Sequence, residues 1–367
     1  MASSPLRELS TAGVSVWVDS LSREMLETGE LARLEREDAV VGVTSNPTIF
    51  EKALSTGSWY DEELREILDR EDDTKEVFLA LAVEDVRRAC DLLLPAFERT
   101  DGVDGRVSLE VDPELAYDRE GTFEEATRLH ALVARPNLFV KIPGTLPGLG
   151  AIEDSIAAGR SINVTLIFSL ERHAEVAEAY VRGLERLVAD GGDPGSAASV
   201  ASFFVSRVDT ETDRRLAELG REDLQGRLAV ANAKLAYQQY LQVFSGERWE
   251  RLAERGARPQ RCLWASTSTK NPAYRDVLYV EDLIGPDTVN TMPLETIAAF
   301  QDHGVVEAGS LTEDVDAARA LLDELAAAGV DYGDVVETLE VEGVEKFSAS
   351  FASLLDGLEA KRGALAA

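Results

Sequence analysis

The stretch 137–145, NLFVKIPGT, has the pattern of a short buried strand that ends at a Pro-Gly pair. Lys141 lies inside this strand, between Val140 and Ile142. Lysine is rarely buried without a reason because its ammonium group is costly to desolvate. Burial lowers the pKa of an amine and leaves part of it neutral and nucleophilic, as Schiff-base formation with a carbonyl requires. The alternative is a lysine that extends its head group from a strand end into water.

The surrounding chain alternates between strand-like and helix-like stretches. The pattern predicts strands at 14–18, 40–50 (broken at Asn46-Pro47), 106–111, 138–142, 161–168, 199–207, 261–267 and 288–292. It predicts helices at 22–37, 60–69, 74–97, 122–134, 149–159, 170–190, 209–244, 275–285, 294–302, 312–328 and 335–360.

Strands that alternate with helices form parallel βαβ units, and eight such units indicate a closed (β/α)8 TIM barrel with additional helices. The competing architecture is a doubly wound open sheet, which often carries a glycine-rich phosphate turn after its first strand. The corresponding turn here, VDSLSRE at 18–24, has no glycine. There is no internal repeat and no long linker, so we expect a single domain over 1–367.

The composition restricts the possible functions. The 68 acidic residues outnumber the 37 basic ones and give a formal charge of −31, which argues against nucleic-acid binding. The two cysteines indicate a reducing, cytoplasmic compartment. We expect no signal peptide and no membrane span, because no long apolar run occurs. The three histidines lack metal-ligand spacing, so we expect no metal site.

Residue parity along five of the predicted strands points to one shared site. In a barrel, one face of each strand packs on helices and the other faces the lumen. We expect the aliphatic faces, including Leu263 and Ala265, to pack on the helices. The opposite faces carry Trp17, Asp19, Ser108, Glu110, Phe139, Lys141, Asn163, Thr165, Trp264 and Ser266. Their polar members then converge near the C-terminal strand ends, where barrel active sites form. The alternative is a set of unrelated polar residues in turns.

These residue types allow a specific chemistry. Lys141 can condense with a ketone, one carboxylate can take a proton from a hydroxyl beside the breaking bond, and the other can hold a water with Thr165. The amides of Asn46 and Asn163 suit polyol hydroxyls, since an amide both donates and accepts. The residues that could hold a phosphate are Arg207, Ser266 and Lys270, unless they serve ordinary loop solvation.

The chain resembles the transaldolase family, in its longer bacterial branch. The motifs that carry the resemblance are VTSNPTIF (43–50), VSLEVDPELAYD (107–118), LFVKIPGT (138–145), INVTLIFS (162–169), ASFFVSR (201–207) and WASTSTKNPAY (264–274). The resemblance implies transfer of a dihydroxyacetone unit from sedoheptulose 7-phosphate to glyceraldehyde 3-phosphate, which gives erythrose 4-phosphate and fructose 6-phosphate. This reaction belongs to the non-oxidative pentose phosphate pathway. No cofactor or metal is implied, and we expect a monomer or homodimer.

The resemblance also assigns roles. Lys141 matches the Schiff-base lysine and Asp19 the acid/base group on the C4 hydroxyl, while Glu110 and Thr165 match the residues that position the catalytic water. The residues that match contacts to the dihydroxyacetone unit are Asn46, Asn163 and Ser202. Arg207 and Ser266 match phosphate ligands. Lys270 stands where the shorter branch has an arginine, and lysine acts more as a point charge than arginine does.

Three rival interpretations remain. A fructose-6-phosphate aldolase of the same superfamily resembles this pattern, with glutamine in place of Glu110 and tyrosine in place of Phe204. A non-catalytic barrel scaffold is disfavoured because an unused buried lysine is costly. A pyridoxal-phosphate enzyme would need a phosphate cradle, and the glycine-rich segment 144–150, GTLPGLG, lacks the Lys-Ser/Thr ending of a nucleotide loop.

Overall fold

The strands of the protein close into a parallel barrel. The computed structural model describes residues 4–366, and within them eight strands pair in sequence order from β1 to β8, which then returns to β1. The strands are β1 (Val14–Val18), β2 (Val40–Val43), β3 (Arg106–Glu110), β4 (Leu138–Pro143), β5 (Ile162–Ile167), β6 (Ser199–Phe204), β7 (Arg261–Ala265) and β8 (Thr288–Met292). The predicted (β/α)8 barrel is confirmed.

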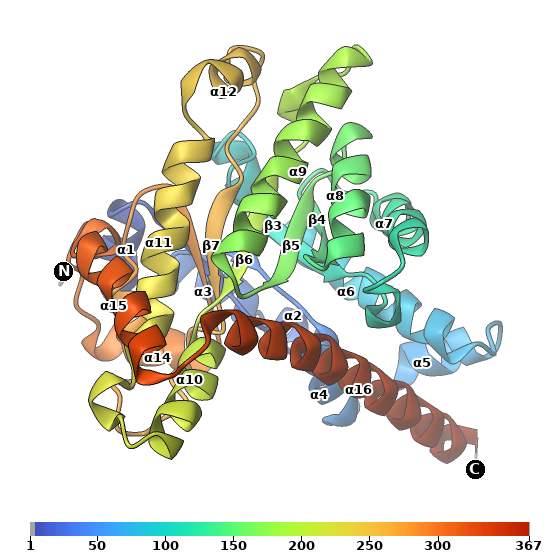
Figure 1. Ribbon diagram of the computed structural model, residues 1–367. Helices are drawn as coiled ribbons and strands as arrows, with labels where there is room; N and C mark the ends of the chain where they lie inside the picture. Colours follow the sequence, from blue (N-terminus) through green and yellow to red (C-terminus); the bar gives the residue numbers. More distant parts are fainter. Residues whose placement is uncertain (1–3, 367) are drawn as a thin grey trace.

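Helices surround the barrel, as Figure 1 shows. They are α1 (Pro5–Thr11), α2 (Arg23–Glu27), α3 (Glu30–Asp38), α4 (Pro47–Ser55), α5 (Asp61–Leu68), α6 (Thr74–Arg99), α7 (Arg119–Val133), α8 (Leu146–Ala157), α9 (Leu170–Ala189), α10 (Ser206–Glu218), α11 (Leu228–Val243), α12 (Gly246–Ala253), α13 (Leu278–Glu281), α14 (Leu294–His303), α15 (Val315–Ala328) and α16 (Tyr332–Ala366). Within residues 4–366, none of them has both the length and the apolar character needed to cross a membrane.

Several predicted elements differ from the observed ones. The predicted helix 22–37 is two helices, because Gly29 adopts a φ of 75° between α2 and α3. The predicted helical region 209–244 is split into α10 and α11 by a turn with Gly220 and Gly226 at positive φ. The second strand ends at Val43, before the predicted break at Asn46-Pro47, and the residues after the break form α4, which the Asn46 side chain caps. The helix predicted at 275–285 contracts to α13, and α1, α4 and α12 were not predicted.

The lumen is filled from its floor by large side chains of the predicted parity. Trp17 on β1 and Phe139 on β4 have ring centroids 6.1 Å apart, although their strands are not neighbours in the barrel. The guanidinium of Arg106 lies 4.7 Å from the centroid of Phe139. Gly42 is required beside this layer, because a Cβ there would lie 2.4 Å from the Trp17 ring. These side chains therefore close the lumen below the C-terminal ends of the strands.

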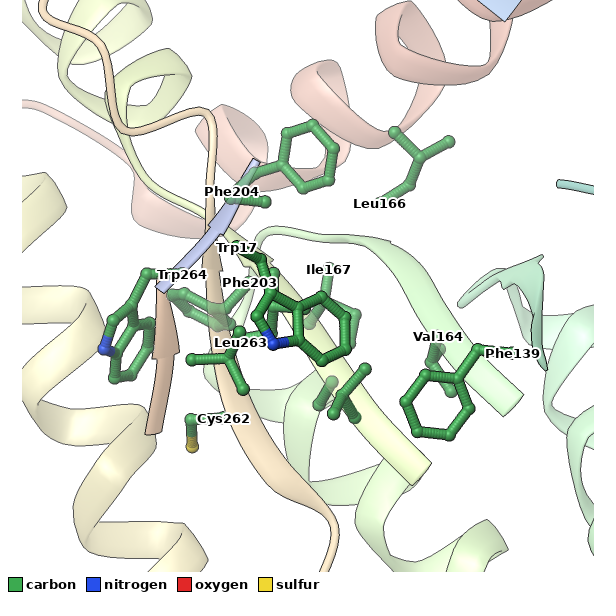
Figure 2. Packing of buried hydrophobic residues seen from close by; sticks show 14 of the residues in the cluster. Trp17, Phe139, Val164, Leu166, Ile167, Phe203, Phe204, Cys262, Leu263 and Trp264 are labelled. Carbon is green, nitrogen blue, oxygen red and sulfur yellow. The ribbon is translucent and has the colours of Figure 1, made fainter. Parts of the chain in front are cut away.

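Strand β7 has the opposite parity to the one predicted. Leu263 and Ala265 pair with Ser202 and Phe204, whereas Trp264 pairs with Phe203. The neighbouring Cys262 contacts the imidazole of His173 on α9 at 3.7 Å, which places the even-numbered residues on the helix side. Figure 2 shows Trp264 and Leu263 on opposite sides of this strand. The prediction that Trp264 faces the lumen is wrong, because this indole packs edge-on against Phe203 under the helices.

The last helix, α16, lies across the C-terminal mouth of the barrel and runs beside α10 and α4 (Figure 1). The helix packs closely against β5 at Gly343, where a Cβ would lie 3.1 Å from the Leu166 side chain. At the start of the helix, the Tyr332 hydroxyl donates to Asn232 and accepts from the amide of Leu170. Near its end, Lys361 pairs with Asp61 at 2.7 Å. The helix is therefore fixed to the barrel at both ends.

Candidate active site

A cavity of about 580 Å³ opens at the C-terminal ends of the strands. Nine of the eleven predicted site residues line it, namely Asp19, Asn46, Lys141, Thr165, Ser202, Phe204, Arg207, Ser266 and Lys270. The other two, Glu110 and Asn163, lie directly behind the lining and contact it through hydrogen bonds. The structure therefore brings together side chains that seven strands, β1 to β7, or the loops after them supply.

Lys141 is buried in the middle of this group, with 4% of its surface exposed. Its Nζ donates to the carbonyl oxygen of Ser45 at 3.1 Å and to Oε2 of Glu110 at 3.2 Å. The ring centroid of Phe347, on α16, lies 5.8 Å from the same nitrogen. The amine thus faces the cavity from an enclosed position, where two oxygens accept hydrogen bonds from it.

Two carboxyl groups share this enclosed space. Burial raises the pKa of Glu110 above its usual range, and the nearby Lys141 opposes that rise. Burial also raises the pKa of Asp19, while Lys141 and a hydrogen bond from Thr44 lower it. The Thr44 hydroxyl donates to Oδ1 of Asp19 at 2.6 Å. Both carboxyls can therefore gain and lose protons nearer to neutral pH than exposed ones, as acid/base catalysis requires.

The two side-chain amides predicted to contact the substrate differ in which of their donor and acceptor groups remain available to a ligand. Asn163 donates to the Ser108 hydroxyl at 3.0 Å and accepts from the Ser202 hydroxyl at 2.6 Å, so it supports Ser202 from below. Asn46 accepts the amide hydrogen of Ile49 at 3.0 Å as the cap of α4. Its NH2 group is therefore the part of this side chain that remains for a ligand in the cavity.

The predicted phosphate ligands lie on one side of the cavity. Arg207 is in the first turn of α10, and its guanidinium lies 5.2 Å from the ring centroid of Phe204 and 5.9 Å from that of Phe347. Its buried Nη1 has no hydrogen-bond partner among residues 4–366. Ser266 reaches the cavity because its φ of 55° turns the chain after β7. An unpartnered guanidinium at a helix N-terminus suits an anionic group.

Lys270 is exposed at the rim, where its Nζ donates to the Ser268 hydroxyl at 2.6 Å. The segment that carries it is held by two tyrosines, which donate to carboxylates of α10. Tyr274 donates to Asp213 at 2.6 Å and Tyr279 donates to Asp209 at 2.8 Å. The sequence did not reveal this arrangement, because the partners are separated by about sixty residues or more.

Three more contributors were missed from the sequence. Thr44 and Ser45 follow directly after β2 within the motif VTSNPTIF (43–50). Their position at the C-terminal end of a strand could have identified them as site residues. Phe347 gave no local signal, since it is one apolar residue on a long helix.

The fold and this cluster define a class of protein: a (β/α)8 barrel with an amine and two carboxyl groups enclosed at the catalytic end of the strands. Residues 16–358 match the family model described as Transaldolase/Fructose-6-phosphate aldolase. The chain belongs to this family.

Similar proteins agree with this assignment. A protein of Parafrankia sp. (strain EAN1pec) named Transaldolase is 55% identical over 367 residues, which cover 99% of this chain and all of the relative. Proteins of the same name from Thermobifida fusca and Mycolicibacterium smegmatis are 54% and 50% identical, and the matches cover 96–98% of each chain.

Proposed function

We propose that this chain is a transaldolase, which transfers a dihydroxyacetone unit from sedoheptulose 7-phosphate to glyceraldehyde 3-phosphate through a Schiff base on Lys141. The observation that carries the proposal is the enclosed Lys141 amine, 3.2 Å from Glu110, in a cavity that Asp19 also lines. The family membership and the name of the similar proteins support it.

The proposed mechanism begins at the ketone of the donor. Nζ of Lys141 adds to the C2 carbonyl, Glu110 gives a proton to the departing hydroxyl, and an iminium and water form. Asp19 then takes the proton of the C4 hydroxyl, the C3–C4 bond breaks, and its electron pair moves into the iminium to give an enamine. The aldehyde leaves, the acceptor aldehyde enters, and the same steps run in reverse. The steps need no metal or organic cofactor.

We assign the phosphate of both substrates to Arg207 and Ser266, with Lys270 as a weaker contributor at the exposed rim. Arg207 has a buried donor without a partner in the described part of the chain, whereas the Lys270 ammonium already has Ser268 and solvent as partners. Burial lowers the pKa of Arg207 and the carboxyls of Asp19 and Glu342 raise it, so a phosphate would supply the missing counter-charge. We expect Arg207→Ala to weaken binding more than Lys270→Ala does.

The second candidate is a fructose-6-phosphate aldolase, which would release free dihydroxyacetone. Phe204 argues against it, because its ring packs 5.1 Å from Phe168 and brings no hydroxyl to the cavity. A hydroxyl near the enamine would assist its protonation. Because a phenylalanine ring has no hydroxyl, protonation is slower and the enamine persists until an acceptor aldehyde binds. Equal rates of dihydroxyacetone release and of transfer would favour the aldolase.

The test is borohydride reduction in the presence of fructose 6-phosphate, followed by peptide mass mapping. We expect a dihydroxyacetone-derived adduct on the peptide that contains Lys141, and none in Lys141→Ala. Lys52→Ala is the matched control, because Lys52 also lines the cavity but is exposed. This control should still form the adduct on Lys141. Transfer activity in Lys141→Ala would overturn the proposal.

A further inference from the structure

A second, smaller cavity of about 130 Å³ lies behind the candidate active site, among β3, α4, α6, α7 and α16. Ser45, Asn46 and Glu110 line its inner end, and apolar side chains such as Leu79 line its walls. Glu110 belongs to this cavity and not to the lining of the larger one, although its Oε2 accepts from Lys141. Glu110 therefore lines the small cavity and contacts the lining of the larger one, while Asn46 lines both.

The other oxygen of Glu110 needs a partner that residues 4–366 do not supply. The side chain is 4% exposed, and Oε1 has no hydrogen-bond partner among the described residues. A buried carboxyl oxygen without a hydrogen bond is costly, and water commonly satisfies such groups. The small cavity has room for several water molecules, and Ser45 and Asn46 line it together with Glu110.

The outer end of the small cavity carries charged groups that reach solvent. Lys75 and Arg128 line it with side chains 46% and 43% exposed. Glu125 lines it too, with 19% of its side chain exposed, and burial raises the pKa of this carboxyl. The small cavity therefore has Glu110 in its lining at one end and solvent-exposed charged groups at the other, with apolar walls between them.

We propose that this small cavity is a water channel, through which the water eliminated during Schiff-base formation leaves and the water for its hydrolysis enters. The inference rests on the proposed function. A sugar phosphate fills the larger cavity during these steps, so a separate route lets water exchange while the substrate stays in place.

Glu110 supplies the proton for the dehydration step and takes it back in the hydrolysis. In the carbinolamine, the C2–O bond breaks, the nitrogen lone pair forms the C=N bond, and the proton of Glu110 passes to the departing hydroxyl to give water. Hydrolysis reverses each movement. During transfer, one water leaves and one water adds, so a trapped water would return its own oxygen to the product ketone.

Oxygen labelling tests this route. Sedoheptulose 7-phosphate labelled with ¹⁸O at C2 reacts with glyceraldehyde 3-phosphate in unlabelled water, and mass spectrometry measures the label in fructose 6-phosphate against an enzyme-free blank. We expect the wild-type product to have lost most of the label. We expect Leu79→Trp, which fills the channel, to retain at least about threefold more label, because an indole removes the room for water.

The control is Leu241→Trp, the same change at a leucine that is 44% exposed on α11, and we expect wild-type label loss there. If Leu79→Trp fails to fold, the pair Leu79→Phe and Leu79→Ala serves, with more label retained in the phenylalanine variant. Transfer with equal label loss in the Leu79 variants and the wild type would overturn the channel alone. An absence of any transfer product would overturn the proposed function and the channel with it.

Discussion

The ring of Phe347, on the last helix, lies 5.8 Å from the Nζ of Lys141, on the fourth strand. The same ring lies 5.9 Å from the guanidinium of Arg207. The face of an aromatic ring attracts a cation and its bulk displaces water, so this one side chain covers two cationic groups of the candidate site.

Removing this ring should change the ratio between release of free dihydroxyacetone from the enamine and its transfer to an acceptor aldehyde. We expect Phe347→Ala to raise the release of free dihydroxyacetone relative to transfer by about tenfold, because water then reaches the intermediate. Phe347→Leu, which keeps an apolar cover, should change the ratio much less. The measurement is dihydroxyacetone released per transfer event at saturating donor. An unchanged ratio in Phe347→Ala would show that the ring does not protect the intermediate.

Thr44 should set the pH range in which Asp19 acts as a base. Its hydroxyl stabilises the ionised carboxylate, and a hydrogen bond to a charged group contributes about 1.5–3 kcal/mol. Thr44→Val should therefore raise the pKa of Asp19 and move the acid limb of the kcat profile upward by about one pH unit. Thr44→Ser keeps the hydroxyl and should keep the wild-type profile. Overlapping acid limbs in all three proteins would contradict this role.

Tyr274 should affect phosphate recognition without touching the substrate. Its hydroxyl holds the segment with Ser266 and Lys270 against Asp213, which also accepts the Gly226 amide at 2.8 Å. We expect Tyr274→Phe to raise KM for fructose 6-phosphate by about tenfold, since a lost charge-assisted hydrogen bond costs about 1.5–3 kcal/mol. The KM for unphosphorylated fructose should not change. A parallel rise in both KM values would indicate general destabilisation.

Asp209 should make stability depend on pH. Burial, its largest influence, raises the pKa of this carboxyl to about 7, against hydrogen bonds from Ala229 and Tyr279 that lower it. A raised pKa means that the folded state holds the proton to higher pH than the unfolded chain does, so the contribution of Asp209 to stability is fully present below about pH 4 and is lost as pH rises towards 7. The loss is at most roughly 4 kcal/mol.

Denaturant unfolding between pH 5 and 8 checks this expectation. Asp209→Asn cannot ionise, so its stability relative to the wild type should increase with pH over this range. Asp190→Asn, at the exposed end of α9, is the matched control and should follow the wild type. A constant difference between Asp209→Asn and the wild type across the range would disprove the argument.

The barrel and most of the site were predictable because both depend on local periodicity. Parallel strands place residues of one parity on one face, and this rule correctly grouped Asp19, Glu110, Lys141 and Thr165. Their assembly at one end follows from the direction shared by all strands.

The rule was wrong at β7, where Trp264 was expected in the lumen. Both faces of this strand carry apolar residues, so the pattern could not decide between Leu263 and Trp264. The contact with Phe203 decides it in the structure. Ser266 was placed correctly for a different reason, because its positive φ, and not strand parity, brings it to the cavity.

Phe347, Tyr274 and the small cavity depend on contacts between distant segments. The position of α16 over the mouth follows from its packing on Leu166 and from its anchors at both ends, which no local pattern encodes. The residues of the proposed chemistry were therefore predictable from local patterns, whereas the residues that enclose and position them were not.

The order of the elements has a consequence for synthesis of the protein. Since α16 follows β8 in the chain, a ribosome completes every strand before it makes the segment that covers Lys141. A nascent barrel would hold this amine open to the bulk solvent and to any cellular aldehyde. The reactive nitrogen is therefore covered only after the whole barrel has been translated.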